Sequence, residues 1–237
     1  MSLPVTDTLQ LREDGFVLHV TLNRPESRNA MSLQMTQELR AVFSAIETSE
    51  HIRVVVLRGA NGHFCAGGDI KDMAGARMRA AESGNDEAYA ELNRAFGHMI
   101  TQVDHAPQVV VALLEGAVLG GGFGLACVSD IAIAVETAQF GLPETGLGVI
   151  PAQIAPFVVQ RIGMTQARRL ALLGARFNGS EAARLGITAQ QISQTIRVAT
   201  IGDVDALLAQ VLHAGQVVEA RATDDPEHCL GHRIHSP

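Results

Sequence analysis

The sequence predicts a layered α/β domain, and three observations favour it. Hydrophobic residues make up 47% of the 237 residues, which is enough apolar material for the core of one full domain. Segments with the pattern of buried strands alternate along the chain with segments of helical periodicity. Glycine clusters lie where strand patterns give way to helical ones. Strands and helices in this order are typical of layered α/β architecture.

The first half of the chain contains a strand pair, a helix and a further strand. Residues 8–12 and 16–22 alternate as two strands, with Glu13-Asp14-Gly15 as the turn between them. Residues 32–48 carry apolar side chains at helical spacing, and Ser32 is well placed as the helix N-cap. Residues 52–57 are mostly β-branched, which predicts a strand buried on both faces.

The second half continues the alternation after an exposed stretch. Residues 76–93 are rich in Ala, Glu and Arg with a break at 83–86, so they predict exposed helix and loop and the most mobile part of the domain. The remaining elements expected from apolar patterning are strands at 109–114 and 130–135, a short helix ending near 128, and helices at 153–162, 165–173 and 180–185.

Composition excludes several classes of protein. The formal charge is −7, no Lys/Arg cluster occurs and only 4% of residues are aromatic, which argues against a nucleic-acid binder and favours a small-molecule substrate. No apolar run reaches membrane-spanning length and the N-terminus lacks signal-peptide features, so we expect a cytoplasmic protein without a membrane partner. Cys65, Cys127 and Cys229 have no CxxC spacing, and the histidines lack the spacing of a zinc site, so we expect neither disulfides nor a metal.

Two glycine-rich turns are candidates for binding an oxyanion. Residues 63–71 contain Gly67-Gly68, and residues 120–124 contain Gly120-Gly121-Gly122. Each turn follows a strand pattern and opens a helix, where unpaired backbone N–H groups accept negative charge. Taken alone, either turn is more simply interpreted as a tight strand-to-helix connection in which glycine relieves crowding. Neither P-loop nor G-x-G-x-x-G spacing is present, so nucleotide-binding folds of those types are excluded.

Glu144 is a lone carboxylate in the otherwise uncharged stretch 140–151. Burial there would raise its pKa toward the range of a general acid or base. An exposed turn glutamate is the alternative that this segment leaves open.

In their joint order and spacing, three motifs resemble the crotonase family, also called the enoyl-CoA hydratase/isomerase superfamily. The motifs are Phe64-Cys65-Ala66-Gly67-Gly68-Asp69-Ile70-Lys71, Gly120-Gly121-Gly122 and Phe140-Gly141-Leu142-Pro143-Glu144. The resemblance begins at the N-terminal hairpin, includes Asn23-Arg24-Pro25 and Asn29-Ala30, and runs to about Gly186. It implies a ClpP/crotonase-like ββα spiral core over residues 1–190, followed by a short, atypical C-terminal helical segment over residues 191–237.

The resemblance also implies roles for individual residues. The N–H groups of Gly68 and Gly121 match the two oxyanion-hole donors for an acyl-CoA thioester carbonyl, and Glu144 matches the catalytic acid/base. The residues expected to line the coenzyme A path are Ala66, Gly68, Asp69, Ile70, Lys71 and Gly121. Arg24 and Arg28 are candidates for its phosphates, or else ordinary surface arginines. Coenzyme A would arrive with the substrate, so no separate cofactor is expected.

One position departs from the two-glutamate hydratases of this family. Gly124 stands where those enzymes carry a first glutamate, two residues after the glycine triplet. The family's single-glutamate members include Δ3,Δ2-enoyl-CoA isomerases and a bacterial hydratase branch that acts on methylglutaconyl-CoA and isohexenylglutaconyl-CoA. The local pattern, with Ile150-Pro151-Ala152-Gln153-Ile154-Ala155-Pro156, is similar to that branch. The related dehalogenases need an aspartate in the stretch 145–162, where none occurs.

The resemblance therefore favours a hydratase that adds water to a 2,3-unsaturated acyl-CoA, in fatty-acid, branched amino-acid or isoprenoid catabolism. An isomerase using the same glutamate is the alternative, and a non-catalytic acyl-CoA-binding or RNA-binding homologue is a third hypothesis. Family members assemble as trimers or hexamers through C-terminal helices. Here residues 203–212 still have a helical pattern, but 213–237 have none, so a divergent or truncated version of these helices is expected.

Overall fold

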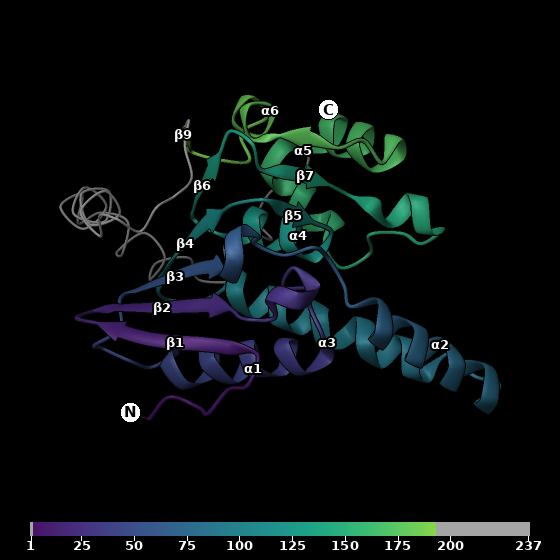
Figure 1. The fold of residues 1–237 in the computed structure, drawn as a ribbon, viewed down its shortest axis with the longest axis horizontal. Coiled ribbons are helices and arrows are strands. Elements are labelled where there is room, and N and C mark those ends of the chain that lie inside the picture. Colours follow the sequence, from purple (N-terminus) through teal and green to yellow (C-terminus); the bar gives the residue numbers. More distant parts are fainter. Residues whose placement is uncertain (1, 193–237) are drawn as a thin grey trace, which may run out of the picture. The chain divides into compact units, whose positions relative to one another are not determined.

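The computed structural model describes residues 2–192, which form two β-sheets with surrounding helices (Figure 1). A six-stranded sheet has the order β1-β2-β3-β4-β6-β9, and a three-stranded sheet has the order β5-β7-β8. In the larger sheet only the β1–β2 pair is antiparallel. Its strands are β1 (Leu9–Asp14), β2 (Val17–Leu22), β3 (Val54–Gly59), β4 (Val109–Leu114), β6 (Ile131–Val135) and β9 (Gln190–Ile192).

The N-terminal hairpin is longer than the sequence pattern suggested. Glu13 and Asp14 belong to β1, and Asp14 pairs with Val17, so the turn consists of Gly15 and Phe16. Gly15 has a φ of +58°, a conformation that glycine adopts without strain. The predicted turn at Glu13-Asp14-Gly15 was therefore wrong at its first two residues. Glu13 and Asp14 are polar, as turn residues often are, but they belong to an edge strand whose outer face is solvated.

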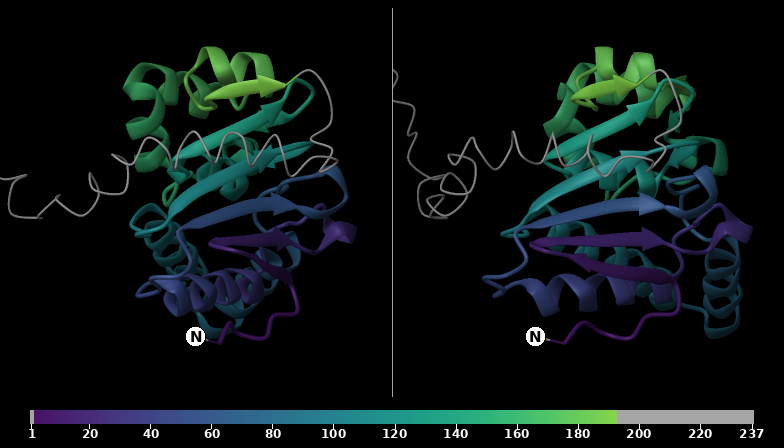
Figure 2. Two further views of the ribbon diagram at one scale, coloured as in Figure 1. Left: turned by 90° about the vertical axis from the view of Figure 1, so that its left-hand side faces the viewer. Right: turned by 60° about the vertical axis from the view of Figure 1, so that its left-hand side comes forward.

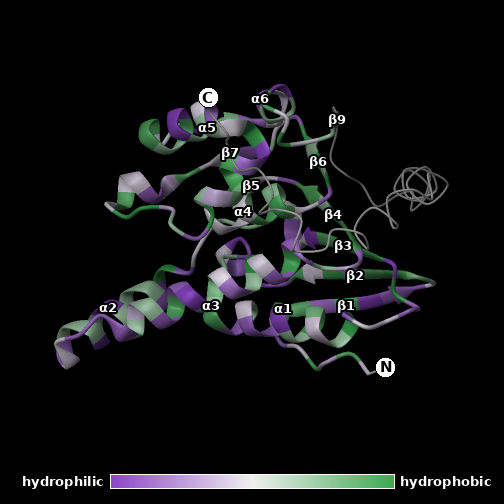
Figure 3. Ribbon diagram, turned by 180° about the vertical axis from the view of Figure 1, so that it is seen from behind, coloured by the Kyte–Doolittle hydropathy of each residue, from purple (hydrophilic) through white to green (hydrophobic). Residues whose placement is uncertain are grey.

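The larger sheet has a buried, largely β-branched centre. β4 is buried along its whole length, and β3 is buried except for Arg58. Figure 2 shows the strands stacked with a common twist from β1 at one edge to β9 at the other. Viewed from behind, the hydrophobic colouring follows β2, β3 and β4, while α2 mixes polar and apolar residues (Figure 3). This contrast places the core at the sheet and leaves α2 on the surface.

The first helix confirms its predicted cap. α1 (Leu33–Ile46) begins after Ser32, whose hydroxyl accepts a hydrogen bond from the Met35 N–H at 3.1 Å. Its buried side chains repeat at helical spacing as predicted: Met35, Leu39, Val42, Phe43 and Ile46.

The stretch predicted as exposed helix and loop consists of two long helices. α2 (Ile70–Ser83) and α3 (Glu87–Asp104) are separated by a break that ends α2 at Gly84, with φ +68°. α2 buries only Ala76 and extends beyond the sheet (Figure 1). α3 continues far past the predicted limit at residue 93, because Met99, Ile100 and Val103 lie buried against α1 and α4.

The remaining helices follow the predicted order. α4 (Gly121–Val128) starts at the glycine triplet, and α6 (Gly179–Arg184) follows Asn178. Residues 153–162 and 165–173 were predicted as two helices, and α5 (Ala155–Leu173) does break between them at Gly163, whose φ of +76° and ψ of 159° are not helical. Apolar periodicity alone did not mark the short strands β5 (Ala117–Leu119), β7 (Gln139–Gly141) and β8 (Phe177–Asn178).

The layered α/β prediction is thus confirmed for the residues that the structure describes. The predicted helix 203–212 and the tail 213–237 lie outside them, and the boundary near residue 190 stays a prediction. Within residues 2–192, no helix combines the length and the hydrophobicity needed to cross a bilayer.

Candidate active site

Residues 64–68 form a strand-like segment that is held from one side by β5. The Cys65 N–H donates to the Ala117 carbonyl at 2.8 Å, and the Leu119 N–H donates to the Cys65 carbonyl at 2.9 Å. Phe64 and Cys65 are fully buried. Burial raises the pKa of the Cys65 thiol to about 11, so this side chain is packing rather than a nucleophile at neutral pH.

The same segment is held on its other side by residues that follow β2. The Ala66 N–H donates to the Arg28 carbonyl at 3.0 Å, and the Met31 N–H donates to the Gly67 carbonyl at 2.8 Å. Gly67 has a φ of +102°, which turns the chain out of the strand path. The next N–H group, that of the exposed Gly68, donates to no acceptor within residues 2–192.

The second turn is built around Gly120 and Gly121. Gly120 has φ +48° and ψ −115°, a combination that favours glycine, and its N–H donates to the Gly141 carbonyl at 3.0 Å. Gly121 is the first residue of α4, where backbone N–H groups lack a partner within the helix. Its N–H also finds no acceptor in the described part of the chain, and the positive end of the helix dipole lies behind it.

The two turns are in direct contact. A methyl group placed on Gly120 would lie 3.5 Å from the Cα atom of Gly67, and one placed on Gly67 would lie 3.5 Å from the Leu119 carbonyl oxygen. The two free N–H groups therefore belong to adjacent segments. Whether they share one oxygen stays a prediction, because this depends on the position of a substrate.

Glu144 stands beside the second turn. It lies in the short helix η3 (Pro143–Leu147), which directly follows β7. A methyl group on Gly120 would come within 2.8 Å of Glu144 Oε1. The other carboxylate oxygen, Oε2, is buried and has no hydrogen-bond partner among the described residues. Burial raises the pKa of Glu144, since the charged form is poorly solvated there.

An aromatic cluster anchors the elements that carry Gly121 and Glu144. Phe123 of α4 meets Phe140 of β7 edge-on at 6.2 Å between ring centroids, and Phe177 of β8 contacts both rings at 5.9 and 5.5 Å. Phe123 and Phe140 are fully buried. Aromatic pairs of this kind contribute more stability than burial of their surface area alone. The cluster therefore holds the start of α4 against the end of β7.

Apolar side chains close the surroundings of Gly124. A methyl group on Gly124 would lie 2.5 Å from Ile154 Cγ2 and 2.9 Å from Ile100 Cδ1. One on Gly121 would lie 2.9 Å from the Phe96 ring. Two-glutamate hydratases carry a glutamate at the position of Gly124. Here the space for that side chain is occupied by Ile100 of α3 and by Ile154, which pack against α4. Sequence patterning did not reveal these contacts, since Phe96, Ile100 and Ile154 are distant in sequence from the glycines.

Asp69 and Arg24, which were expected near coenzyme A, pair with each other. The Arg24 guanidinium lies 2.7 Å from the Asp69 carboxylate, which also caps α2 by accepting the Lys71 N–H at 2.8 Å. Burial opposes the charge of Asp69, but the hydrogen bonds from Arg24 and Lys71 outweigh it and lower its pKa. The Asp69 side chain is therefore committed to the fold, and Arg24 is not a free surface cation.

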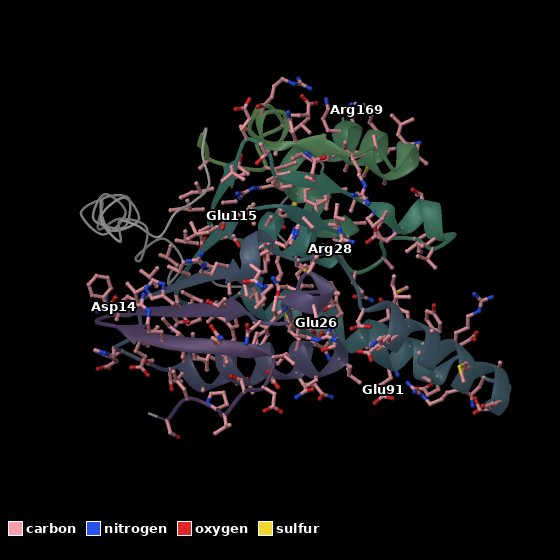
Figure 4. The ribbon with its side chains drawn as sticks, in the orientation of Figure 1. Asp14, Glu26, Arg28, Glu91, Glu115 and Arg169 are labelled. Atoms are coloured by element: carbon pink, nitrogen blue, oxygen red, sulfur yellow. The ribbon has the colours of Figure 1, made fainter. Side chains whose placement is uncertain are left out.

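The other residues predicted along the coenzyme A path remain accessible. Ile70 is 76% exposed, Lys71 and Arg28 are exposed, and Ala66 is half-buried. Arg28 ends the η1 turn (Pro25–Ser27) and forms no ion pair with the described residues (Figure 4). Lys71 also lines a hollow of about 100 Å³ between α1, α2 and α3. That hollow is lined by neither glycine turn nor Glu144, so it is separate from the candidate active site.

Comparison with known proteins decides the family. Residues 12–217 match the model of the enoyl-CoA hydratase/isomerase family. This chain belongs to that family. Pseudomonas aeruginosa AtuE is 55% identical, with a TM-score of 0.81 over 91% of this chain and 82% of AtuE. An enoyl-CoA hydratase/isomerase from Marinobacter aquaeolei is also 55% identical, with a TM-score of 0.82 over 96% of this chain and 85% of that one.

More distant relatives add context. A Thermobifida fusca protein solved in complex with acetoacetyl-CoA is 28% identical, with a TM-score of 0.77 over 91% of this chain and 85% of that one. A peroxisomal Delta(3,5)-Delta(2,4)-dienoyl-CoA isomerase from Arabidopsis thaliana is 31% identical over 80% of this chain. The chain spans 62%, 70% and 75% of the length of three curated relatives. The predicted crotonase fold is confirmed by these neighbours.

Proposed function

We propose that the protein is an enoyl-CoA hydratase that adds water to a 2,3-unsaturated acyl-CoA. The observation that carries the proposal is the buried Oε2 of Glu144, which lies beside two turns; within residues 2–192 neither this oxygen nor the Gly68 and Gly121 N–H groups have a hydrogen-bond partner. Preorganised donors of this kind stabilise a developing oxyanion by about 3 to 4 kcal/mol each. The raised pKa of Glu144 suits a group that accepts and returns a proton near neutral pH.

The proposed reaction uses Glu144 for both proton transfers. The thioester oxygen accepts hydrogen bonds from the Gly68 and Gly121 N–H groups. The Glu144 carboxylate takes a proton from water while the water oxygen bonds to C3, and the C2=C3 electrons move toward the thioester to give an enolate. The protonated Glu144 then donates that proton to C2. Charge develops on the thioester oxygen, where the donors lie, and the carboxylate is regenerated.

We further propose a branched substrate of the glutaconyl-CoA type. The support is that, among residues 2–192, apolar Ile154 and Ile100 and not a second carboxylate lie against Gly124. Water is then oriented by one carboxylate. The sequence similarity to the single-glutamate hydratase branch points to the same substrates. Coenzyme A would enter as part of the thioester, and Ala66, Ile70 and Lys71 remain accessible to it.

An isomerase is the second candidate. The same Glu144 could remove a proton from C2 of a 3-enoyl-CoA and return it to C4, which requires no bound water. The lone carboxylate favours this chemistry as much as hydration, and the Arabidopsis thaliana relative bears an isomerase name. The two reactions differ in one measurable respect, which is whether oxygen from water enters the product.

The deciding experiment separates deuterium entry from water addition. Crotonyl-CoA, a 3-enoyl-CoA and 3-methylglutaconyl-CoA are incubated with the protein in deuterated water, and products are analysed by mass spectrometry. We expect one added water and one deuterium at C2 with 3-methylglutaconyl-CoA, at the highest kcat/KM. Deuterium exchange without water addition would reject the hydratase in favour of the isomerase. Faster hydration of crotonyl-CoA would reject the branched substrate alone. No reaction with any thioester would favour a non-catalytic acyl-CoA-binding homologue.

Assembly and location stay predictions. A homotrimer or hexamer is expected from the family resemblance, and sedimentation or mass photometry of the full chain measures it directly. A cytoplasmic location is the corresponding expectation for the cell.

A further inference from the structure

Residues 24–31 run alongside the oxyanion segment, residues 60–69, from its beginning to its end. We refer to residues 24–31 as the clamp segment. Asn29 holds the beginning of the oxyanion segment, backbone hydrogen bonds hold its middle at Ala66 and Gly67, and Arg24 holds its end at Asp69. The Asp69 N–H also donates to the Met31 carbonyl at 3.0 Å. Gly68 therefore lies between two neighbours that are both fixed by the clamp segment.

Asn29 is the key residue of the clamp segment, and all its side-chain polar groups form hydrogen bonds. Its side-chain amide donates to the carbonyls of Ala60 at 2.9 Å and His63 at 2.6 Å, and its Oδ1 accepts the Arg24 N–H at 2.9 Å. The residue is fully buried. An aspartate of the same shape could accept the Arg24 N–H but could not donate to the two carbonyls.

The backbone of Asn29 matters as well as its side chain. Arg28 and Asn29 both have left-handed conformations, with φ of +50° and +56°. Asparagine adopts this conformation more readily than most residues, because its short polar side chain forms local hydrogen bonds. In this turn the Arg28 carbonyl accepts the Ala66 N–H, while the Asn29 side chain bonds to the loop at residues 60–63. One residue thus couples the loop at 60–63 to the strand-like segment that ends at Gly68.

The clamp segment fixes both neighbours of Gly68 without using the Gly68 N–H, which stays free. We infer that Asn29 is a positioning residue, whose two donated hydrogen bonds hold the Gly68 N–H in the oxyanion hole. This inference rests on the proposed function. A donor contributes fully only when it is preorganised at about 2.7 to 3.1 Å from the developing charge, so a small displacement weakens catalysis before it weakens the fold.

The loss of Asn29 should be local. Cys65 remains hydrogen-bonded to β5 through Ala117 and Leu119, and the Arg24–Asp69 ion pair remains at the other end. The two bonds to the Ala60 and His63 carbonyls are lost directly, and because these residues lead into the segment that ends at Gly68, their release changes the position of the Gly68 N–H without unfolding the segment. Gln108 offers a matched control, because its buried side-chain amide also donates to a carbonyl, that of Ile46 at 2.7 Å, at the opposite end of α1 from Ser32.

The experiment compares Asn29→Asp with Gln108→Glu in the full chain. Each substitution replaces a buried donating amide by an acid, so both should lower the thermal midpoint. The readouts are kcat, KM and the ultraviolet difference spectrum of bound acetoacetyl-CoA, whose enolate oxygen would occupy the oxyanion hole. We expect Asn29→Asp to lower kcat by about 10- to 100-fold, to change KM less and to weaken the enolate band. Gln108→Glu should leave kcat and the band unchanged.

Three outcomes would overturn the inference. An Asn29→Asp variant with normal kcat and a normal enolate band would show that Asn29 does not position Gly68. Equal losses of kcat in both variants would show a general effect of stability. A wild-type protein that gives no enolate band would reject the oxyanion hole itself, and with it the proposed function. If Asn29→Asp does not accumulate as folded protein, Arg24→Lys tests the other end of the clamp segment. We expect that variant to lower kcat by a few-fold, and an unchanged kcat would contradict the clamp.

Discussion

The two sides of the Gly120–Gly121 turn differ in chemistry. On one side Glu144 places a carboxylate beside Gly120, with one oxygen buried and unpartnered. On the other side Gly124 is covered by Ile154 and Ile100, which leave no room for a side chain. Both sides use a glycine, but for opposite reasons. Gly120 makes room for a charged group, whereas Gly124 lets two apolar side chains approach the helix backbone.

Within residues 2–192, the proposed single-glutamate site therefore differs from a two-glutamate site by more than one missing glutamate. Removal of a glutamate alone would leave a cavity beside α4, and a cavity destabilises a protein in proportion to its volume. Here the apolar side chains occupy that space. The packing of α3 and Ile154 against Gly124 and the chemistry of Glu144 therefore belong to one arrangement, and each side can be tested separately.

The largest effect is expected from Glu144→Gln. Glutamine keeps the size of the side chain but cannot move a proton, so kcat should fall by at least about 10²-fold, while binding of CoA thioesters persists. Steady-state kinetics and calorimetric titration with a CoA thioester measure the two effects. Glu47→Gln, at an exposed position beyond α1, is the control and should have normal kcat. Unchanged turnover in Glu144→Gln would remove Glu144 from the mechanism.

The next largest effect is expected from Gly124→Glu. Restoring the glutamate of two-carboxylate hydratases should not raise the hydration rate, because its Cβ would overlap Ile154 and Ile100. Overpacking costs about 1 to 3 kcal/mol, and the buried charge adds to it. Chemical denaturation measures the loss. Gly124→Ala should be destabilised through overpacking alone, and Gly124→Ala with Ile100→Val, which removes the Cδ1 atom 2.9 Å from the added methyl group, should recover part of the stability. A stable Gly124→Glu variant with faster hydration would refute the packed arrangement.

A smaller effect is expected from Gly120→Ala. The added methyl group would come within 2.8 Å of Glu144 Oε1, and alanine is strained at φ +48° and ψ −115°. Backbone strain of this kind costs about 1 to 3 kcal/mol. We expect kcat to fall about 10-fold through displacement of Glu144, with the fold retained. Gly146→Ala, at an exposed position with open space around it, is the matched control. A normal kcat in Gly120→Ala would show that Glu144 tolerates displacement.

The sequence predicted most of the larger sheet because its strands are short apolar runs with clear ends. The helix cap at Ser32 and the strand at residues 109–114 were located to the residue. The strands β5 and β7 were missed, since three residues are too few to show a period. The predicted division of residues 153–173 into two helices was confirmed, because Gly163 leaves the helical conformation at φ +76° and ψ 159°.

The candidate site was predicted unevenly for a similar reason. Gly68, Gly121 and Glu144 lie in recognisable motifs, and the structure brings their segments together. Asp69 was expected along the coenzyme A path, but its carboxylate pairs with Arg24, and no local pattern reveals a partner 45 positions away. Ile154 was noted only as part of the motif at residues 150–156, and Ile100 was not singled out. The role of these two isoleucines depends on their contact with Gly124, and this contact forms only in the folded chain.

The smallest effect is the pH dependence that burial imposes on Glu144. Because its pKa is raised in the folded protein, the folded state holds a proton that the unfolded state releases between the ordinary pKa of 4.5 and the raised value. Stability should therefore fall as pH rises through that window, and Glu144→Gln should remove this part of the slope. The kcat/KM should change in the opposite direction, falling as pH drops through the raised pKa, because the base must be ionised. Thermal melts and rate profiles from about pH 4 to 8 test both. Identical pH dependence of melting in the wild-type protein and in Glu144→Gln would show that Glu144 is as well solvated as a surface residue. That result would refute the contrast between a buried carboxylate at Gly120 and apolar packing at Gly124.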